Sequence, residues 1–595
     1  MNSVGQIRRS QLITTFGPGA LIDLPKDSAI VGGLDVWPEE GKLEEIQEPR
    51  LARKIAALMK MSAVRLYAPP ASSDDPRAMK PVVVFRFPEW FLVQEKGPRD
   101  ERVLSRRLVH RKVLDRNNQF DGLPTVAIRF VRACPRGHVD DIDWYGYVHG
   151  QGDPCKGQLW LDERGISGGL GDLVVRCASC GKSRNLQEAS KLELNPLGTC
   201  RGARPWLGPG GAEGCNQPSR LLNRTASNAY FPQVMSVLSL PDRSSKVDEV
   251  VREFWEYLQI VDGPAELAVL KKKPRISERL LPFSDSEVLE VIRRAKEGVG
   301  GDRPIKEVEL EAILAAPEGF GEDVPVNPDF HARRLPDRCW RQPGEFDGID
   351  AVIQLHRLRE VTTLIGFTRL EAELPDLQGE YETDVQRASI ASEPSWFPAV
   401  ENRGEGIFLQ FRTQAVRTWL ERPGVRRRLE SLMRGHQRWT DGRRSKRLFP
   451  GGPYILLHSL SHVLIQSLAM RCGYPASSIR ERIYVDLKGD RYGLLLYTSS
   501  SDAEGTLGGL VHQGRYMAGH LRQALRSSEL CSNDPICAHH APGESLEGRW
   551  LLGAACHGCL LVAETSCEMR NDYLDRALLV PVIGLTDAAF FESAG

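Results

Sequence analysis

The sequence predicts a multidomain α+β fold that is held together by structural zinc modules. The chain has thirteen cysteines, and most of them gather in two stretches, residues 134–215 and residues 531–567. Two cysteine pairs have the C-x-x-C spacing that presents two thiolates to one metal ion: Cys177/Cys180 and Cys556/Cys559. The rest of the chain mixes short β-branched runs with segments of helical period, which is typical of an α+β protein.

The first two regions differ in composition. Residues 1–130 form an N-terminal mixed α/β region, in which Val82–Phe87 and Thr125–Val131 have the β-branched and aromatic content of strands. Residues 131–225 are rich in glycine and cysteine and contain few long periodic segments. We therefore expect a zinc-binding module there, ordered by metal rather than by a hydrophobic core.

The third region, residues 226–450, is expected to be helical and mixed. Three segments carry apolar residues at helical spacing: Val247–Ile260, Asp285–Glu297 and Lys306–Ala315. Residues 350–420 return to mixed α and β character. The stretch from Ala415 to Arg447 is basic and largely helical, and Pro423–Gly424 is expected to break that helix.

The last region, residues 451–595, is expected to be a C-terminal zinc-binding domain. It begins with an apolar segment of helical length and continues with a strand pair around Ile483–Tyr497. A glycine loop, Gly505–Leu510, leads into another helix and then into the last cysteine cluster. We expect this loop, like Phe16–Ala20 near the N-terminus, to be a tight turn that needs positive φ rather than an anion site.

Bulk composition limits the functions that are open to the chain. Among its 595 residues, 78 are basic and 78 acidic, so any nucleic-acid contact must come from local patches. The N-terminus lacks the apolar run of a secretion signal, which disfavours disulfides and indicates a cytoplasmic protein. The most apolar segment, Tyr454–Met470, is interrupted by polar residues, so we expect a core helix and no membrane contact.

The first cysteine cluster divides by spacing into two candidate zinc sites. Cys177 and Cys180 form a knuckle that Cys200 and Cys215 complete as a Cys₄ site. The remaining candidate ligands make a softer Cys₂His₂ set: Cys134, His138, His149 and Cys155. A different division, in which Cys134 or Cys155 joins the knuckle, also fits the spacing.

The second cluster offers one cysteine more than a zinc ion needs. Its candidate ligands are Cys531, Cys537, Cys556, Cys559 and Cys567, and spacing does not decide which four bind. We expect these sites to be structural, because a catalytic zinc keeps an open position beside a carboxylate base. His458 and His462 lie four residues apart on one helix face, where a hydrogen-bonded core pair is favoured over a metal pair.

No nucleotide-binding motif is found in the sequence. Gly181-Lys182-Ser183 resembles the end of a Walker A loop, but Arg176 stands where that motif requires its first glycine. The tripeptide also lies within a zinc knuckle rather than at a turn between a strand and a helix. The chain is therefore expected not to be an ATPase.

Local basic patches are the sequence feature that favours nucleic acid. Residues 411–447 contain twelve arginines or lysines against three acidic residues, with Trp439 among them. Arginines beside an aromatic ring suit phosphate contact and base stacking. The candidate DNA-binding residues are Arg426, Arg427, Arg428, Arg434, Arg438, Arg443, Arg444, Lys446 and Arg447. A solvated charged face is the alternative.

Several motifs together resemble a known family. The segment Leu530–Arg576, with its CHGCL and LDR sequences, is similar to the C-terminal zinc-binding domain of MrfA-type DNA-repair helicases. Leu457–Ile465 (LHSLSHVLI) and Leu496–Leu510 (LYTSSSDAEGTLGGL) resemble the same domain. Four further segments narrow the resemblance to the DrmB family of the DISARM antiphage system: Arg8–Leu24, Ala133–Trp144, Arg357–Leu370 and Gly404–Phe411.

This resemblance implies a function and a partner. It implies a non-catalytic subunit of a bacterial antiphage defence complex that docks on the DrmA helicase, which supplies the ATPase. It also implies that the subunit supports recognition or processing of foreign phage DNA. Two alternatives stay open: a structural scaffold for the helicase without DNA contact, and an autonomous zinc-dependent nuclease, although the sequence shows no open metal site with carboxylate ligands.

Overall fold

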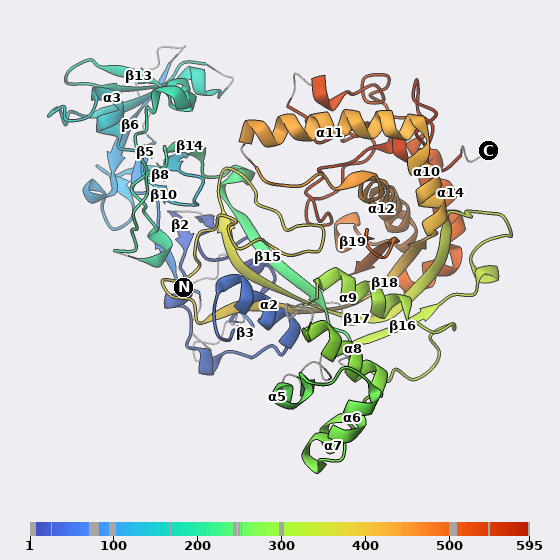
Figure 1. Cartoon of the computed structure of the whole chain (residues 1–595). Helices are drawn as coiled ribbons and strands as arrows, with labels where there is room; N and C mark the ends of the chain where they lie inside the picture. Colours follow the sequence, from blue (N-terminus) through green and yellow to red (C-terminus); the bar gives the residue numbers. More distant parts are fainter. Residues whose placement is uncertain are drawn as a thin grey trace. The chain divides into compact units, whose positions relative to one another are not determined.

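The computed structural model shows an α+β protein (Figure 1). Its chain divides into two compact units. The N-terminal unit comprises Met1–Met235, Thr362–Leu374 and Glu382–Val400, and the C-terminal unit comprises Ser236–Val361, Pro375–Tyr381 and Glu401–Gly595. The structure describes residues 7–24, 27–70, 82–94, 103–165, 168–208, 210–241, 247, 250–251, 253–296, 303–443, 445–498, 509–544 and 548–592.

A small antiparallel sheet begins the N-terminal unit. Its order is β1 (Leu21–Leu24), β2 (Asp27–Val31) and β4 (Val84–Arg86), so the strand expected over Val82–Phe87 is confirmed. The glycine turn before β1 is also confirmed, because Gly19 has a φ of +85° and a Cβ there would lie 2.4 Å from Cζ of Phe367. Three other elements are α1 (Gln11–Thr14), α2 (Pro49–Met59) and β3 (Arg65–Tyr67).

The largest sheet of the N-terminal unit crosses the boundary that we expected at residue 130. Its order is β13-β12-β11-β6-β5-β8-β7. The bounds are β5 (Trp90–Val93), β6 (Leu104–His110), β7 (Gln119–Phe120), β8 (Leu123–Ala127), β11 (Leu159–Glu163), β12 (Leu173–Cys177) and β13 (Ser183–Asn185). Leu108 of β6 lies opposite Leu159 of β11, so residues on both sides of 130 share one sheet.

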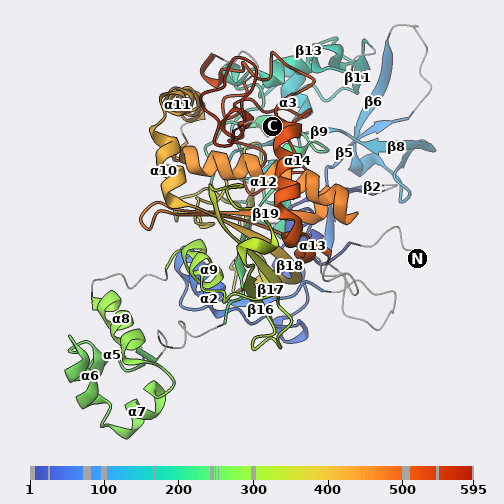
Figure 2. The same ribbon diagram turned by 90° about the vertical axis from the view of Figure 1, so that its right-hand side faces the viewer.

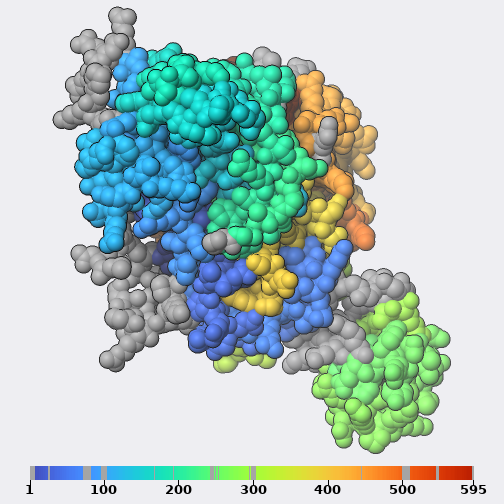
Figure 3. Space-filling view, turned by 90° about the vertical axis from the view of Figure 1, so that its left-hand side faces the viewer, coloured from blue at the N-terminus to red at the C-terminus, as the bar shows by residue number. Residues whose placement is uncertain are grey.

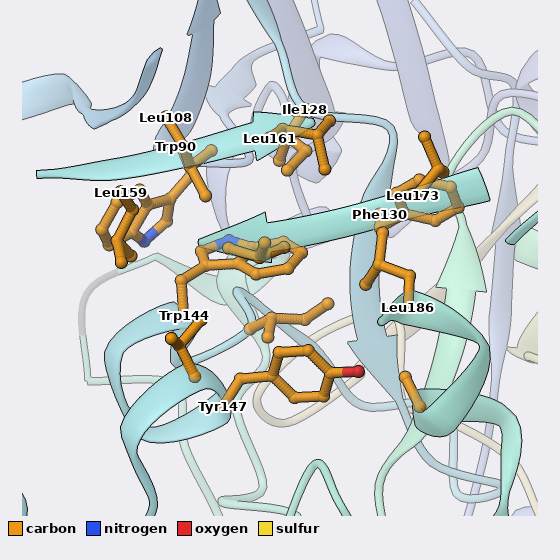
Figure 4. Close-up of a cluster of buried hydrophobic side chains, with 14 of the residues drawn as sticks. Trp90, Leu108, Ile128, Phe130, Trp144, Tyr147, Leu159, Leu161, Leu173 and Leu186 are labelled. Carbon is orange, nitrogen blue, oxygen red and sulfur yellow. The ribbon is translucent and has the colours of Figure 1, made fainter. Parts of the chain in front are cut away.

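This sheet has a hydrophobic core, which corrects the expectation that metal alone orders residues 131–225. Helix α3 (Trp144–His149) packs on the sheet, and Trp144 and Tyr147 are buried against it (Figure 4). Strand side chains such as Leu159 and Val175 complete the cluster. Burial of aromatic rings on this scale contributes stability without a metal.

The N-terminal unit also contains a three-stranded sheet. Its order is β10 (Val139–Asp140), β9 (Phe130–Ala133) and β14 (Arg220–Asn223), and all pairings are antiparallel. The run Thr125–Val131, expected as one strand, is divided between β8 and β9. The turn between β9 and β10 carries two candidate zinc ligands, Cys134 and His138.

The C-terminal unit includes a small helical lobe with its own core (Figures 2 and 3). It consists of α5 (Trp255–Leu258), α6 (Pro264–Leu270), α7 (Pro274–Leu280) and α8 (Asp285–Lys296). The helices expected over Asp285–Glu297 and Lys306–Ala315 are confirmed as α8 and α9 (Ile305–Leu314). The helix expected over Val247–Ile260 is confirmed at the described residues 247, 250, 251 and 253, but a turn at Phe254 separates these from α5, and the helix ends at Leu258.

Long strands form a further sheet, most of whose residues belong to the C-terminal unit. β18 (Trp396–Phe411) pairs antiparallel with β20 (Arg491–Thr498), which forms a hairpin with β19 (Ile479–Asp486), as expected around Ile483–Tyr497. Two more strands, β16 (Phe330–Arg334) and β17 (Ile349–Thr368), pair antiparallel, and β15 (Phe231–Leu238) borders β17.

Helices α10 to α14 include the basic stretch and the most apolar segment of the chain. The basic stretch forms α10 (Thr413–Glu421) and α11 (Pro423–Arg443), and the expected break falls at Arg422, just before a proline at the first helical position. α12 (Gly451–Cys472) is followed by α13 (Gly509–His512) and α14 (Met517–Ser528). Of the helices described, α12 alone is apolar and long enough to cross a bilayer, but 72% of its apolar window is buried in the protein.

Candidate metal centres and basic helix

The first candidate centre lies at the turn between β9 and β10. Cys134, His138, Cys200 and Cys215 place their ligand atoms within 4.8 Å of one another. His138 Nδ1 faces the sulfurs, at 3.3 Å from Cys134 and 3.6 Å from Cys200. Its other ring nitrogen, Nε2, lies 2.8 Å from Glu213 Oε1. A carboxylate on the far nitrogen orients a ligating histidine and strengthens it as a ligand.

A buried arginine supports the same turn. Arg369 is fully buried, and its Nε donates to the carbonyl oxygen of Gly137 at 2.9 Å. Its other nitrogens donate to the carbonyls of Gly19 and Ala229. The guanidinium thus connects the N-terminal glycine turn with the Cys134–His138 turn.

The second candidate centre is built by α3 and the β12–β13 hairpin. His149, Cys155, Cys177 and Cys180 place their ligand atoms within 4.8 Å of one another. Cys177 ends β12, and Gly181, with a φ of +74°, makes the turn into β13. Burial acts to raise the pKa of Cys177, but the backbone N–H of Cys180 and the nearby His149 ring lower it to about 6.

His149 is oriented to serve as a ligand. Its Nδ1 lies 3.0 Å from the carbonyl oxygen of Tyr145, so that nitrogen carries the proton. The other nitrogen, Nε2, is buried without a hydrogen-bond partner in the described structure. A buried nitrogen that lacks a partner and lies beside three thiols is well placed to bind a metal ion.

The third candidate centre follows α14. Four sulfur atoms lie within 4.8 Å of one another there, those of Cys531, Cys537, Cys556 and Cys559. The Sγ atoms of Cys531 and Cys556 are 3.4 Å apart. A hydrogen bond with Cys559 lowers the pKa of Cys537 to about 6. The spacing did not show which four of the five cysteines come together. In the structure the fifth, Cys567, lies elsewhere, beside His458, His462 and Glu481.

These groupings correct our division of the first cysteine cluster. The Cys177/Cys180 knuckle is completed by His149 and Cys155, and Cys200 and Cys215 join the Cys134–His138 turn instead. The alternative in which Cys155 joins the knuckle agrees with this arrangement. The donor sets are two Cys₃His groups and one Cys₄ group, and such sulfur-rich, closed sets fit a structural Zn²⁺.

Comparisons with known proteins agree with these sites. Residues 460–560 match the family described as "MrfA Zn-binding domain", and that range contains the four cysteines of the third centre. Residues 8–231 match the family "Domain of unknown function (DUF8724)". The chain is 33% identical over 483 residues to the DISARM protein DrmB of Bacillus paralicheniformis (strain ATCC 9945a / NCIMB 11709 / CD-2), covering 78% of this chain and 82% of that relative.

The chain belongs to the DrmB family of DISARM proteins. It is thus a DISARM antiviral defence component with a zinc-binding domain near its C-terminus. In this DrmB-family chain, Lys182 of the Walker-like tripeptide lies at the β12–β13 turn and pairs with Asp153 at 2.6 Å. The tripeptide therefore lies beside the second candidate centre, and it leads into strand β13 rather than directly into a helix.

Helix α11 of this DrmB-family chain presents arginines on its exposed side. Arg426, Arg427, Arg434 and Arg438 are exposed, and the opposite side buries Val425 and Leu432 among others. Arg427 pairs at the surface with Asp587. The guanidinium of Arg438 lies 5.9 Å from the ring centre of Trp550, which places an aromatic beside this row.

Other members of the predicted DNA-binding set are placed differently. Arg428 is buried and paired with Asp575, so its inclusion is corrected: it cannot contact DNA. Arg447 is largely buried, pairs with Asp572 at 3.4 Å and lies over Trp439. Arg443, at the end of α11, is exposed and also lies over Trp439. Lys446 is exposed, and Arg444 lies outside the described residues.

Proposed function

We propose that this chain is a non-catalytic, zinc-stabilised subunit of a cytoplasmic DISARM complex. In this proposal the chain docks on a DrmA-type helicase, which supplies the ATPase, and helps to hold foreign DNA for recognition or processing. Membership of the DrmB family and the match to a zinc-binding domain support the defence role. Three closed sulfur-rich groups support a structural use of zinc.

The observation that carries the DNA part of the proposal is the exposed arginine row of α11. Four arginines, Arg426, Arg427, Arg434 and Arg438, occupy one helix that is anchored on its other side. Arginine presents a planar fork of donors that suits phosphate oxygens, and a rigid helix holds the forks at fixed spacing. Because the chain as a whole has no net charge, such a local row is the place where phosphates would bind.

Two other functions receive less support. An autonomous nuclease needs a metal site with an open position and carboxylate ligands, whereas the three centres are filled by cysteine and histidine. A scaffold without DNA contact remains the alternative outcome of the test below. It would leave the α11 arginines as a solvated face or as part of the helicase interface.

The test combines DNA affinity and subunit association on one variant. Arg426, Arg427, Arg434 and Arg438 are changed together to alanine, and Arg428 is left in place to preserve the fold. The matched control removes the same charge from the helical lobe by changing Lys271, Lys272, Lys273 and Arg275 to alanine. Fluorescence anisotropy of the complex with labelled DNA is measured over a series of salt concentrations.

We expect the α11 variant to bind DNA more weakly and with a flatter salt dependence, by about 0.7–0.9 in slope for each phosphate that an arginine no longer neutralises. The lobe variant should bind as the unchanged protein does. If the α11 variant dissociates from the helicase but the remaining helicase-bound fraction binds DNA normally, the row belongs to the protein interface. Unchanged affinity and association would refute both roles.

A further inference from the structure

A fourth group of metal-ligand side chains lies in the interior of the C-terminal unit. His458 and His462 come from α12, Glu481 from β19, and Cys567 from the segment after the third centre. Their ligand atoms lie within 4.8 Å of one another, and all four residues are buried. Helix, strand and loop therefore bring together residues that are far apart in the sequence.

The distances within this group resemble those of a metal coordination shell. His458 Nε2 lies 3.1 Å from Cys567 Sγ and 3.0 Å from Glu481 Oε1. His462 Nε2 lies 3.5 Å from Glu481 Oε2. Ligand atoms around a tetrahedral zinc, with bonds of about 2.0–2.3 Å, are separated by roughly 3.3–3.8 Å. The His462–Glu481 distance of 3.5 Å falls in this range, and the two His458 distances, 3.0 and 3.1 Å, are slightly shorter. One N–H group on His458 Nε2 cannot point at both Cys567 Sγ and Glu481 Oε1. A metal ion bound to Nε2 can be bound by that sulfur and that oxygen as well.

Both histidines are held in the orientation that a metal ligand requires. His458 Nδ1 lies 3.3 Å from the carbonyl oxygen of Tyr573, and His462 Nδ1 lies 2.8 Å from that of Leu560. A carbonyl only accepts, so each Nδ1 carries a proton. In the neutral ring, the Nε2 lone pair then points into the group, which is the usual second-shell arrangement of zinc-bound histidine.

Without a cation, this arrangement leaves polar atoms poorly satisfied. His462 Nε2 is buried and has no hydrogen-bond partner in the described structure. The Ser461 hydroxyl and the Glu568 N–H donate to the buried carboxylate of Glu481, but the Nε2 lone pairs of two neutral histidines would still face it. Buried groups of this kind are costly unless a positive charge compensates them.

Cys567 has the surroundings of a bound thiolate. Its Sγ accepts the backbone N–H groups of Asn571 at 3.1 Å and of Met569 at 3.4 Å. A sulfur of the third centre accepts a similar hydrogen bond, because the N–H of Asn533 lies 3.4 Å from Cys531 Sγ. Such donors stabilise a thiolate that a cation holds, whereas burial beside Glu481 raises the pKa of the Cys567 thiol when no cation compensates it.

We propose that His458, His462, Glu481 and Cys567 bind a fourth ion, Zn²⁺, in a closed structural site. Two neutral imidazoles, one carboxylate and one thiolate balance the charge of a divalent zinc ion, which makes burial of the whole group possible. The site ties α12 and β19 to the C-terminal segment that follows the Cys₄ centre. It replaces the hydrogen-bonded core pair that the sequence favoured for His458 and His462.

The competing account is a metal-free network in which both histidines are protonated and paired with Glu481. The two accounts differ in the number of zinc ions that the full-length chain retains. The first measurement is therefore zinc content by elemental analysis and native mass spectrometry, after dialysis that removes loosely bound metal. Four ions for each unchanged chain would agree with the four groups, and three would overturn the proposal.

The second measurement locates the additional ion. Cys567→Ser should lower the zinc content by one ion, whereas Cys472→Ser, a change outside the four groups, should leave it unaltered. A folded Cys567→Ser protein that keeps as many ions as the unchanged chain would also overturn the assignment. If Cys567→Ser fails to fold, the zinc content of the unchanged chain alone decides between four ions and three.

Discussion

Arg428 Nε donates to Asp575 Oδ2 at 2.5 Å in the interior of the C-terminal unit, where Asp575 has no exposed surface. The Oδ1 atom of the same carboxylate accepts the N–H groups of Ala554 and Ala577. One arginine of the Arg426–Arg428 triplet thus fastens α11 to the C-terminal segment. Arg428 therefore has a structural role, although it stands in a run of three arginines that the sequence alone does not distinguish.

Removal of Arg428 should therefore destabilise the protein. Arg428→Ala leaves the Asp575 carboxylate buried without its counter-charge, which costs about 3–5 kcal/mol. The free energy of unfolding, from urea titration followed by circular dichroism, measures the change. Arg426→Ala is the matched control, since its exposed side chain should alter stability by less than about 0.5 kcal/mol. Equal effects of the two changes would contradict the assignment.

Loss of one knuckle ligand should empty the second centre. Cys177→Ser removes a thiolate that His149, Cys155 and Cys180 surround, so zinc content should fall by one ion. The melting temperature should fall too, because metal binding at such a site is part of the folding free energy. Cys339→Ser, a change at a cysteine outside the four groups, should alter neither quantity. A Cys177→Ser protein with unchanged zinc would show that this centre is not a metal site.

Arg369 should support the first centre through the backbone. Arg369→Ala leaves three buried carbonyls without their donor, at about 1–3 kcal/mol for each one that stays unsatisfied. Since one of them belongs to Gly137, zinc should also leave the Cys134–His138 centre at a lower chelator concentration. Chelator titration and urea unfolding measure the two effects, and the exposed Arg116→Ala is the control. A lower free energy of unfolding together with zinc loss at the same chelator concentration would show that Arg369 does not support the metal site.

The fold could be predicted from the sequence where local signals are strong. Helices α8 and α9 follow from their apolar spacing, and the break before Pro423 follows from proline stereochemistry. The large sheet of the N-terminal unit, from β13 to β7, could not be predicted, because several of its strands have two to five residues and pair across long distances in the chain. Short strands carry too few residues for period-2 alternation to appear.

The candidate ligands followed from residue type, whereas their grouping did not. Spacing identifies the Cys177/Cys180 knuckle, but it cannot show that α3 brings His149 to it. Likewise, Cys567 lies near His458 because its neighbour Ser566 accepts a hydrogen bond from the backbone of Glu481 in β19, which packs on α12. The four-residue spacing of His458 and His462 was the only sign of the fourth group in the sequence. It did not indicate a metal site, because no acidic residue lies near the two histidines in the sequence. Glu481 supplies that acid from a strand.

The isolated chain should not hydrolyse ATP. Lys182 is held by Asp153 at the tip of a hairpin, and no P-loop accompanies it. Phosphate release by the purified chain should equal the buffer background, and Lys182→Ala should not change it. Hydrolysis that persists through purification and disappears with Lys182→Ala would contradict this prediction.

The most direct test of the proposed function is phage plating on cells that carry the whole defence operon with variants of this chain. The α11 variant, with alanine at Arg426, Arg427, Arg434 and Arg438, should lose most of the protection while the protein accumulates normally. The lobe control, with alanine at Lys271, Lys272, Lys273 and Arg275, should protect as the unchanged chain does. Full protection by the α11 variant would contradict a role for this helix in holding phage DNA.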